Sequence, residues 1–194
     1  SGRWTATLED GVTLDGFDAV VVALPAPQAA PLLDAAPALA AEVARVAMHP
    51  CWAVLVAFDE PVPARFDGAW VLHSPLGWVA RDGSKPKRGR AETWMLHASA
   101  AWSAAHVDDG ADAVGPFLLN AFADLVPKGL PLPVHLGVHR WRYAMADPPL
   151  AKGALVDRDA RLVVCGDWCL GNRIEAAWLS GLAGAAAVHG AAAG

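Results

Sequence analysis

The stretch Leu162-Val-Val-Cys-Gly-Asp-Trp-Cys-Leu-Gly-Asn-Arg-Ile-Glu-Ala-Ala-Trp-Leu-Ser-Gly181 decides how the chain is interpreted. Its first four residues are typical of a buried strand, which would deliver Gly166 and Asp167 to the carboxyl edge of a sheet. A short glycine-containing loop and a helix predicted from about residue 173 to 189 follow. Ligands of open α/β sheets bind at this edge, and free N–H groups at a helix start favour electron-rich ligand atoms. On spacing alone, a structural corner capped by the aspartate explains the pattern equally well.

The rest of the chain alternates between two hydrophobic periods. Residues 17–24 have the continuous hydrophobicity of a strand buried on both faces of a parallel sheet. Before them, residues 3–8 and 12–14 flank Glu9-Asp-Gly, a hairpin signal because an Asp-Gly pair readily adopts positive φ. Further helices are predicted at 28–33, 37–46, 100–107 and 112–125, and further strands at 51–58, 69–73, 78–81, 93–98 and 133–143.

This order of elements predicts an α/β protein with an α+β insert. Residues 1–47 and 151–194 carry the parallel-type strands and would form a dinucleotide-type domain. Residues 48–150 would form a second domain with a mixed, mostly antiparallel sheet. The second domain interrupts the first in the chain.

The composition excludes several classes of protein. Of 194 residues, 55% are apolar and 18% charged, so the chain can bury a core. Its net charge of −5 argues against nucleic acid as a partner. The three cysteines do not suit a disulfide framework and indicate a reducing cytoplasm. The Ala-rich segment 174–194 has too few large apolar residues for a membrane span and predicts a buried helix. His135 and His139 on one strand would be about 13 Å apart, so no metal site is predicted.

Several motifs together carry a family resemblance. They are Phe17-Asp-Ala-Val-Val-Val-Ala-Leu-Pro25, Trp78-Val-Ala-Arg-Asp82 with Ser84-Lys-Pro86, Glu92-Thr-Trp-Met-Leu-His-Ala98, Trp102-Ser103, His139-Arg-Trp-Arg-Tyr-Ala144 and Cys165-Gly-Asp-Trp-Cys169. Each motif is unspecific alone, but in this order they resemble the amine-oxidase-like FAD-dependent oxidoreductases, and most closely their bacterial renalase-like members. The resemblance covers most of the chain.

The resemblance implies an FAD-binding domain of glutathione-reductase type with an inserted substrate domain. Within it, the Asp167 carboxylate would hydrogen-bond the flavin ribityl chain, and Gly166 would let the cofactor approach the backbone. The backbone N–H groups of the helix start would face the flavin N1/O2 edge and stabilise the reduced flavin. The helix-start residues are Asn172, Arg173 and Ile174. The turn formed by Ala23, Leu24 and Pro25 would lie near the cofactor's phosphates.

One part of the family pattern is missing from this sequence. The family begins with a strand, a G-x-G-x-x-G turn and a helix that holds the pyrophosphate. None of the 18 glycines forms a G-x-G, and no acidic residue stands where one would bind the ribose. The chain is therefore expected to be the carboxyl-terminal three-fifths or so of a longer enzyme. Alone, it is expected to bind FAD poorly or not at all.

Three segments are candidates for contact with the substrate or the flavin. On the predicted strand at 133–143, His139, Trp141 and Tyr143 share one face, while Arg140 and Arg142 share the other. The aromatic face could wall a flavin or nicotinamide ring, with the arginines meeting phosphate. A sheet face packed on helices, with the arginines in water, explains the pattern as well. His97 could face the flavin or be structural, and the four cations of residues 85–90 could meet phosphate or form a solvated loop.

These features lead to one functional hypothesis and two alternatives. The first is an FAD-dependent enzyme that oxidises isomeric dihydronicotinamide dinucleotides by hydride transfer to flavin, with O2 reduced to hydrogen peroxide. The second is an FAD-dependent amine oxidase. The third is a non-catalytic binding or assembly fragment, in which the open edge of the sheet pairs with a missing amino-terminal segment or a second chain.

Overall fold

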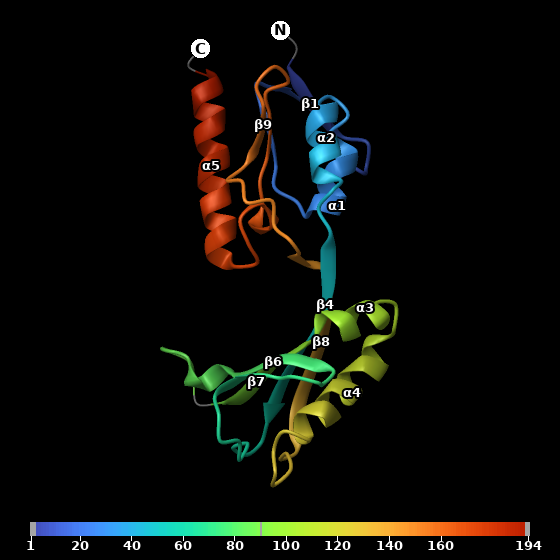
Figure 1. Cartoon of the computed structure of the whole chain (residues 1–194), viewed down its shortest axis with the longest axis vertical. Coiled ribbons are helices and arrows are strands. Elements are labelled where there is room, and N and C mark those ends of the chain that lie inside the picture. The colour runs from blue at the N-terminus through green and yellow to red at the C-terminus, as the bar shows by residue number, and fades with distance from the viewer. Residues whose placement is uncertain (1–2, 90, 193–194) are drawn as a thin grey trace. The chain divides into compact units, whose positions relative to one another are not determined.

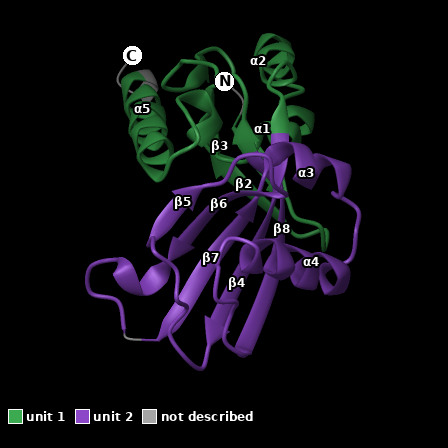
Figure 2. Cartoon of the chain, turned by 60° about the horizontal axis from the view of Figure 1, so that its bottom comes forward, with its two compact units in different colours: residues 1–48, 145–194 green, residues 49–144 purple. Residues whose placement is uncertain are grey.

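The computed structural model describes residues 3–89 and 91–192 (Figure 1). The chain divides into two compact units, coloured separately in Figure 2. Unit 1 comprises residues 1–48 and 145–194, and unit 2 comprises residues 49–144. The sequence placed the corresponding boundaries at 47/48 and 150/151. None of the described helices combines the length and apolar character needed to cross a membrane.

Unit 1 is built on a three-stranded sheet in the order β3–β10–β9. Strand β3 (Val20–Val22) runs parallel to β10 (Leu162–Val164), and β9 (Leu155–Asp157) runs antiparallel to β10. Beside this sheet lies the predicted hairpin of β1 (Trp4–Thr7) and β2 (Thr13–Phe17), whose turn contains Gly11 at φ 84°. The hairpin and the parallel strand pair were both expected from the sequence.

Helices cover the two faces of this sheet. Helices α1 (Ala26–Ala29) and α2 (Pro37–Val43), joined by the short helix η1 (Ala30–Leu32), bury their apolar side chains in one core with β10. Helix α5 (Ile174–Ala192) packs on the other face, where a Cβ at Gly184 would lie 3.4 Å from Val163. The small residues of α5 thus allow a close helix–sheet approach.

Two expectations for unit 1 were wrong. The apolar run at 17–24 is not one strand buried on both faces, because Phe17 ends β2 and β3 covers only three residues. Val21 in β3 is 47% exposed, since β3 is an edge strand. Helix α5 is not buried all round either: Ile174 is 92% exposed and Trp178 67% exposed, so only one side of the helix meets the sheet.

Unit 2 is built on a five-stranded sheet in the order β5–β6–β7–β4–β8. Its strands are β4 (Met48–Phe58), β5 (Gly68–Trp70), β6 (Leu76–Arg81), β7 (Glu92–Ala98) and β8 (Pro133–Ala146). Unit 2 also contains helices α3 (Ala100–Ala105) and α4 (Ala111–Ala123). Helix α4 contributes side chains to the hydrophobic core on one face of the sheet. Gly115 allows the approach, because a Cβ there would lie only 2.6 Å from Val138 of β8.

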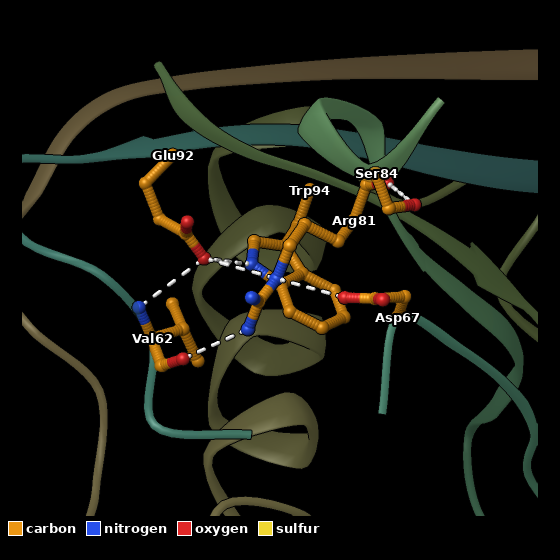
Figure 3. A network of polar contacts seen from close by, with 6 residues as sticks. All are labelled: Val62, Asp67, Arg81, Ser84, Glu92 and Trp94. Atoms are coloured by element: carbon orange, nitrogen blue, oxygen red, sulfur yellow. Dashed lines mark hydrogen bonds and ion pairs between the residues drawn. The ribbon is translucent and has the colours of Figure 1, made fainter. Parts of the chain in front are cut away.

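A partly buried charged network lies at the edge of this core (Figure 3). Oε1 of Glu92 accepts hydrogen bonds from Trp94 Nε1 at 2.7 Å and Val62 N at 3.2 Å, and lies 3.4 Å from Arg81 Nε. The guanidinium of Arg81 donates to the Val62 carbonyl at 2.9 Å and lies 4.9 Å from the Trp94 ring centroid. Asp67 adds an outer ion pair to Arg81 at 3.6 Å. We refer to these five residues as the Arg81 network, which ties the loop before β5 to strands β6 and β7.

Candidate functional site

The carboxyl ends of β3 and β10 form a corner in unit 1. The parallel register continues past both strands, because Cys165 N donates to the Val22 carbonyl at 3.1 Å. One step further, Trp168 Nε1 donates to the Leu24 carbonyl at 3.0 Å. The structure therefore brings the segments 23–25 and 166–167 together at one edge. We refer to residues 23–25, 166–167 and 172–176 as the β3–β10 corner.

The side chain of Trp168 leaves no room for a Cβ at Gly166. The backbone of Gly166 is extended, with φ 166°, so it carries no conformational demand for glycine. A Cβ would, however, lie 2.4 Å from Nε1 of Trp168, whose ring is buried beneath the turn. The structure thus gives this glycine a packing role, making room for an indole, and the close approach of a ligand stays a prediction. The Gly166 N–H donates to Ser180 Oγ at 3.0 Å.

The Asp167 carboxylate is half-buried and only partly used by the protein. Its Oδ1 accepts from Trp168 N at 2.8 Å, and its main-chain carbonyl accepts from Leu170 N and Gly171 N as the chain winds through η3 (Asp167–Cys169). No hydrogen bond from a described residue reaches Oδ2. The carboxylate thus accepts a hydrogen bond inside the 3₁₀ turn that it begins, and one of its oxygens has no hydrogen-bond partner within the described chain.

The first turn of α5 also leaves donors open. Arg173 N donates to the Gly171 carbonyl and Ala177 N to the Arg173 carbonyl, but residues 174–176 find no backbone acceptor within the described chain. The side chain of Asn172 bonds to the protein in both directions, because it accepts from Ala146 N at 2.7 Å and donates to Ala146 O at 2.9 Å. The sequence had assigned Asn172 only through its backbone. Its amide pins the loop before α5 to the end of β8.

One face of the five-stranded sheet in unit 2 points away from the helices. The strand registers place Trp70 beside Trp78, Trp78 beside His97, and Leu55 beside Met95 on this face. Strand β8 joins it through Gly137, where a Cβ would lie 3.9 Å from Leu55 Cβ. By alternation, the side chains that follow on this face of β8 are His139, Trp141 and Tyr143. We refer to this surface as the open face.

The open face carries several exposed aromatic side chains. Trp70 is 80% exposed and packs on Trp78, with ring centroids 4.8 Å apart. Trp141 is 56% exposed and lies 4.2 Å from the His139 ring. Burial, together with the nearby Lys85, lowers the pKa of His97, so its imidazole is neutral at neutral pH.

The charged side chains of this sheet lie elsewhere. Arg140 donates to the Val107 carbonyl at 2.6 Å and lies 5.5 Å from the Trp52 ring, while Arg142 donates to Asp108 at 2.8 Å. The loop after α3 therefore occupies both arginines that could have met phosphate. Within the described strands, the positions on the open face hold no Asp, Glu, Lys or Arg. In the loop after β6, Asp82 pairs with two of the four cations, Lys85 at 2.9 Å and Arg88 at 3.7 Å.

These two surfaces sit on a fold that is shared with flavin-dependent oxidoreductases. A family model for flavin-containing amine oxidoreductases matches residues 1–189, and the chain belongs to this family. A protein of Exiguobacterium assigned as a protoporphyrinogen oxidase has a similar structure, with a TM-score of 0.71 and 13% identity over 97% of this chain and 44% of that protein. The cyclohexylamine oxidase of Brevibacterium oxydans gives 0.63 and 15% over 91% and 43%, and an oxidoreductase from Methanosarcina mazei gives 0.62 and 15% over 90% and 44%.

The comparisons show an α/β fold of the FAD-binding type with a mostly antiparallel insert. The chain spans less than half the length of these solved structures. The β3–β10 corner fits the cofactor that the family implies, FAD, since an unpartnered carboxylate oxygen and unpartnered N–H groups match the hydroxyls of a ribityl chain and the electron-rich edge of a flavin ring. The roles of the individual corner residues stay predictions.

Proposed function

We propose that the complete gene product containing this chain is an FAD-dependent oxidoreductase that binds its flavin at the β3–β10 corner. The observation that carries this proposal is that open polar groups of two kinds flank the short turn η3. One is the free oxygen of Asp167, and the other is the set of N–H groups of residues 174–176. The carboxylate oxygen would accept from hydrogen-bond donors of a ligand, and the N–H groups would donate to acceptors of the same ligand.

The chain's own residues would divide the work at this corner. Asp167 accepts from ribityl hydroxyl groups, and the α5 N-terminus places backbone donors and the positive end of its dipole at a site of developing negative charge. The backbone at residues 23–25, held to the turn by Trp168, lies at the same edge and would pass near the cofactor's phosphates. FAD held by these residues would supply the hydride acceptor for the substrate and, once reduced, the two electrons that convert O2 to hydrogen peroxide.

For the substrate we propose a renalase-like role, the oxidation of isomeric dihydronicotinamide dinucleotides. A dihydronicotinamide donates hydride directly, so the enzyme needs no base to remove a proton first. The open face supports this proposal because it offers indole and phenol rings for stacking, a neutral His97, and no strand carboxylate to act as a base. In this proposal His97, Trp141 and Tyr143 contact the nicotinamide ring.

Amine oxidation is the second candidate. The family description names amines, and one of the similar structures is a cyclohexylamine oxidase. Exposed indoles such as Trp70 and Trp141 could also hold an ammonium group by cation–π attraction. The two candidates differ in one measurable property, namely whether a dihydronicotinamide dinucleotide or an amine reduces the flavin.

A further part of this proposal concerns what covers unit 1. The outer edge of β3 is unpaired in its sheet, Val21 on it is half exposed, and α5 presents Ile174 and Trp178 to solvent. Unpaired parallel strands are normally covered. We propose that a β–α–β segment, on the same polypeptide or on a second chain, pairs with β3 and packs on α5. The three cysteines, all buried and free, support a cytoplasmic location.

Anaerobic titration of the complete gene product tests the proposal. We expect the purified protein to show flavin absorbance. Isomeric dihydronicotinamide dinucleotides, mixed with it anaerobically, should bleach this absorbance by reducing the flavin. Hydrogen peroxide should form when air is then admitted. Reduction by alkylamines alone would select the amine-oxidase candidate. A colourless protein that takes up no added FAD would contradict the cofactor, and the third hypothesis, a non-catalytic assembly fragment, would then stand.

A further inference from the structure

The hydroxyl of Ser180 joins helix α5 to the turn that carries Asp167. Ser180 lies in the second turn of α5 and is fully buried. Its Oγ accepts from Gly166 N at 3.0 Å and donates to the Gly153 carbonyl at 2.6 Å. Gly166 directly precedes Asp167, so the hydrogen bond acts one residue from the carboxylate.

Among the described residues, Ser180 is the single hydrogen-bond partner of the Gly166 N–H. After β10, the parallel ladder ends with Cys165 N bonded to Val22 O, and the next N–H points away from β3. On the opposite side of the turn, Trp168 bonds to Leu24 O. The turn is therefore held by α5 through Ser180, by the segment after β3 through Trp168, and by the N–H groups of Leu150 and Lys152, which donate to the Trp168 and Cys169 carbonyls at 3.2 Å and 2.9 Å. Of these restraints, only the bond to Ser180 links the turn to α5.

We propose that Ser180 is a positioning residue for the flavin, because it fixes the Asp167 carboxylate relative to the first turn of α5. This inference rests on the proposed function. A single flavin must meet the carboxylate and the N–H groups of residues 174–176 together, so their separation must be constant. Ser180 provides that constraint from within the helix that supplies the N–H groups, without touching the cofactor itself.

Its chemistry suits this task. A hydroxyl can accept one hydrogen bond and donate another, whereas an alanine would leave the Gly166 N–H and the Gly153 carbonyl both unpaired. Burial raises the pKa of the Cys169 thiol, and a hydrogen bond with Ser180 lowers it in part. Apart from Ser180, the only fully buried polar residue found in the described chain is Ser103 of unit 2, whose Oγ accepts from Trp52 N at 3.1 Å.

Ser103 therefore supplies a matched control. We would prepare Ser180→Ala, Ser180→Cys and Ser103→Ala in the complete gene product. The three readouts are the hydrogen-exchange rate of the Gly166 amide without flavin, the dissociation constant for FAD, and the urea unfolding midpoint. Each alanine variant loses one buried hydroxyl, so both should lower the midpoint.

Only the Ser180 variants should change the corner. We expect Ser180→Ala to exchange the Gly166 amide at least about tenfold faster and to bind FAD about tenfold more weakly, as the loss of one hydrogen bond implies. Ser103→Ala should leave both quantities unchanged. Ser180→Cys, which keeps a weak donor and acceptor, should lie between wild type and alanine, and it decides the matter if Ser180→Ala does not fold.

The outcomes separate this inference from the proposed function. Wild-type protein that binds FAD, together with Ser180 variants of unchanged affinity, overturns the role of Ser180 alone. Equal loss of affinity in Ser103→Ala and Ser180→Ala also overturns it, since the effect would then follow from general stability. Wild-type protein that binds no FAD overturns the proposed function, and the flavin role of Ser180 with it.

Discussion

The β3–β10 corner of unit 1 and the Arg81 network of unit 2 use their polar groups in opposite ways. In the Arg81 network, one oxygen of Glu92 accepts from two N–H groups and pairs with a guanidinium, so the protein itself uses these polar groups. In the corner, neutral hydrogen bonds hold the backbone, because Ser180 accepts from Gly166 N and Trp168 donates to the Leu24 carbonyl. One oxygen of Asp167 and the first N–H groups of α5 find no hydrogen-bond partner among the described residues. A charged group whose hydrogen bonds all go to the protein stabilises the fold. A charged group that is held in place with free hydrogen-bonding capacity is available to a ligand.

This contrast also sorts the motifs that carry the family resemblance. Arg81, Glu92 and Trp94 belong to two of the most recognisable motifs, and the structure places all three in the Arg81 network (Figure 3). The hydrogen bonds and the ion pair of these three side chains join strands β6 and β7 to each other and to the loop before β5. Motifs of equal prominence in the sequence thus serve stability in unit 2 and, in our proposal, cofactor binding in unit 1.

The largest expected effect comes from breaking the Arg81 network. Glu92→Ala would leave the Arg81 guanidinium half-buried without its main counter-ion and should lower the free energy of unfolding by about 3 kcal/mol in urea titration. Replacing both partners, Arg81→Met with Glu92→Leu, should recover much of this loss. FAD binding per folded molecule should not change. A single-variant cost below about 1 kcal/mol would show that the network is not scaffold.

The second effect concerns the space above Trp168. Gly166→Ala places a Cβ 2.4 Å from the indole nitrogen, so the ring or the turn must move, at an expected cost of about 1–3 kcal/mol in unfolding free energy. Gly181→Ala in α5 is the control, because a Cβ there meets nothing within 4 Å. It should stabilise the helix by about 0.5–1 kcal/mol. Equal responses from the two variants would contradict the packing argument.

A third variant separates cofactor binding from stability. Asp167→Asn keeps an oxygen that can accept from Trp168 N but removes the charge and one acceptor. We expect FAD affinity to fall about tenfold while the unfolding free energy changes by less than about 0.5 kcal/mol. Fluorescence titration and urea unfolding of the same sample measure the two quantities. A fall in stability without a change in affinity would make Asp167 another scaffold residue.

The smallest effect is a pH dependence in unit 2. Burial lowers the pKa of His97 in the folded protein, so the unfolded chain binds the proton more tightly. The stability that the neutral imidazole contributes is therefore present above about pH 6.5 and is lost as the pH falls from there toward the folded pKa. Urea midpoints measured at pH 8 and pH 5 should differ less for His97→Asn than for wild type. An equal difference in both proteins would rule out His97 as the source.

The comparison also explains how much could be predicted from sequence. The strand pattern predicted that Gly166 and Asp167 lie at a sheet edge, and the family resemblance added residues 23–25 to the same site. The hydrogen bond from Trp168 Nε1 to the Leu24 carbonyl shows that the two segments meet. The alternation of His139, Trp141 and Tyr143 fixed their shared face. The side-chain bonds of Ser180 and Asn172 span 14 and 26 residues and depend on how α5 docks, so no local pattern contains them.

The errors have similar physical causes. Val21 was expected to be buried because its segment is uniformly apolar, but burial depends on a neighbour beyond the sheet edge. For Arg140 and Arg142 the sequence left phosphate contact and solvent exposure open, and in the structure each donates to the loop after α3, more than 30 residues away in the chain. Charged residues on strands are normally expected at the surface. The sequence therefore did not reveal that Arg81 and Glu92 pair with each other beside the core.

Hydrogen exchange in the first turn of α5 tests the central claim most directly. The amides of residues 174–176 should exchange rapidly in the flavin-free gene product and become strongly protected when FAD is added. The amides at the start of α4, in unit 2, should not respond. FAD that binds without protecting residues 174–176 would contradict the placement of the flavin at the β3–β10 corner.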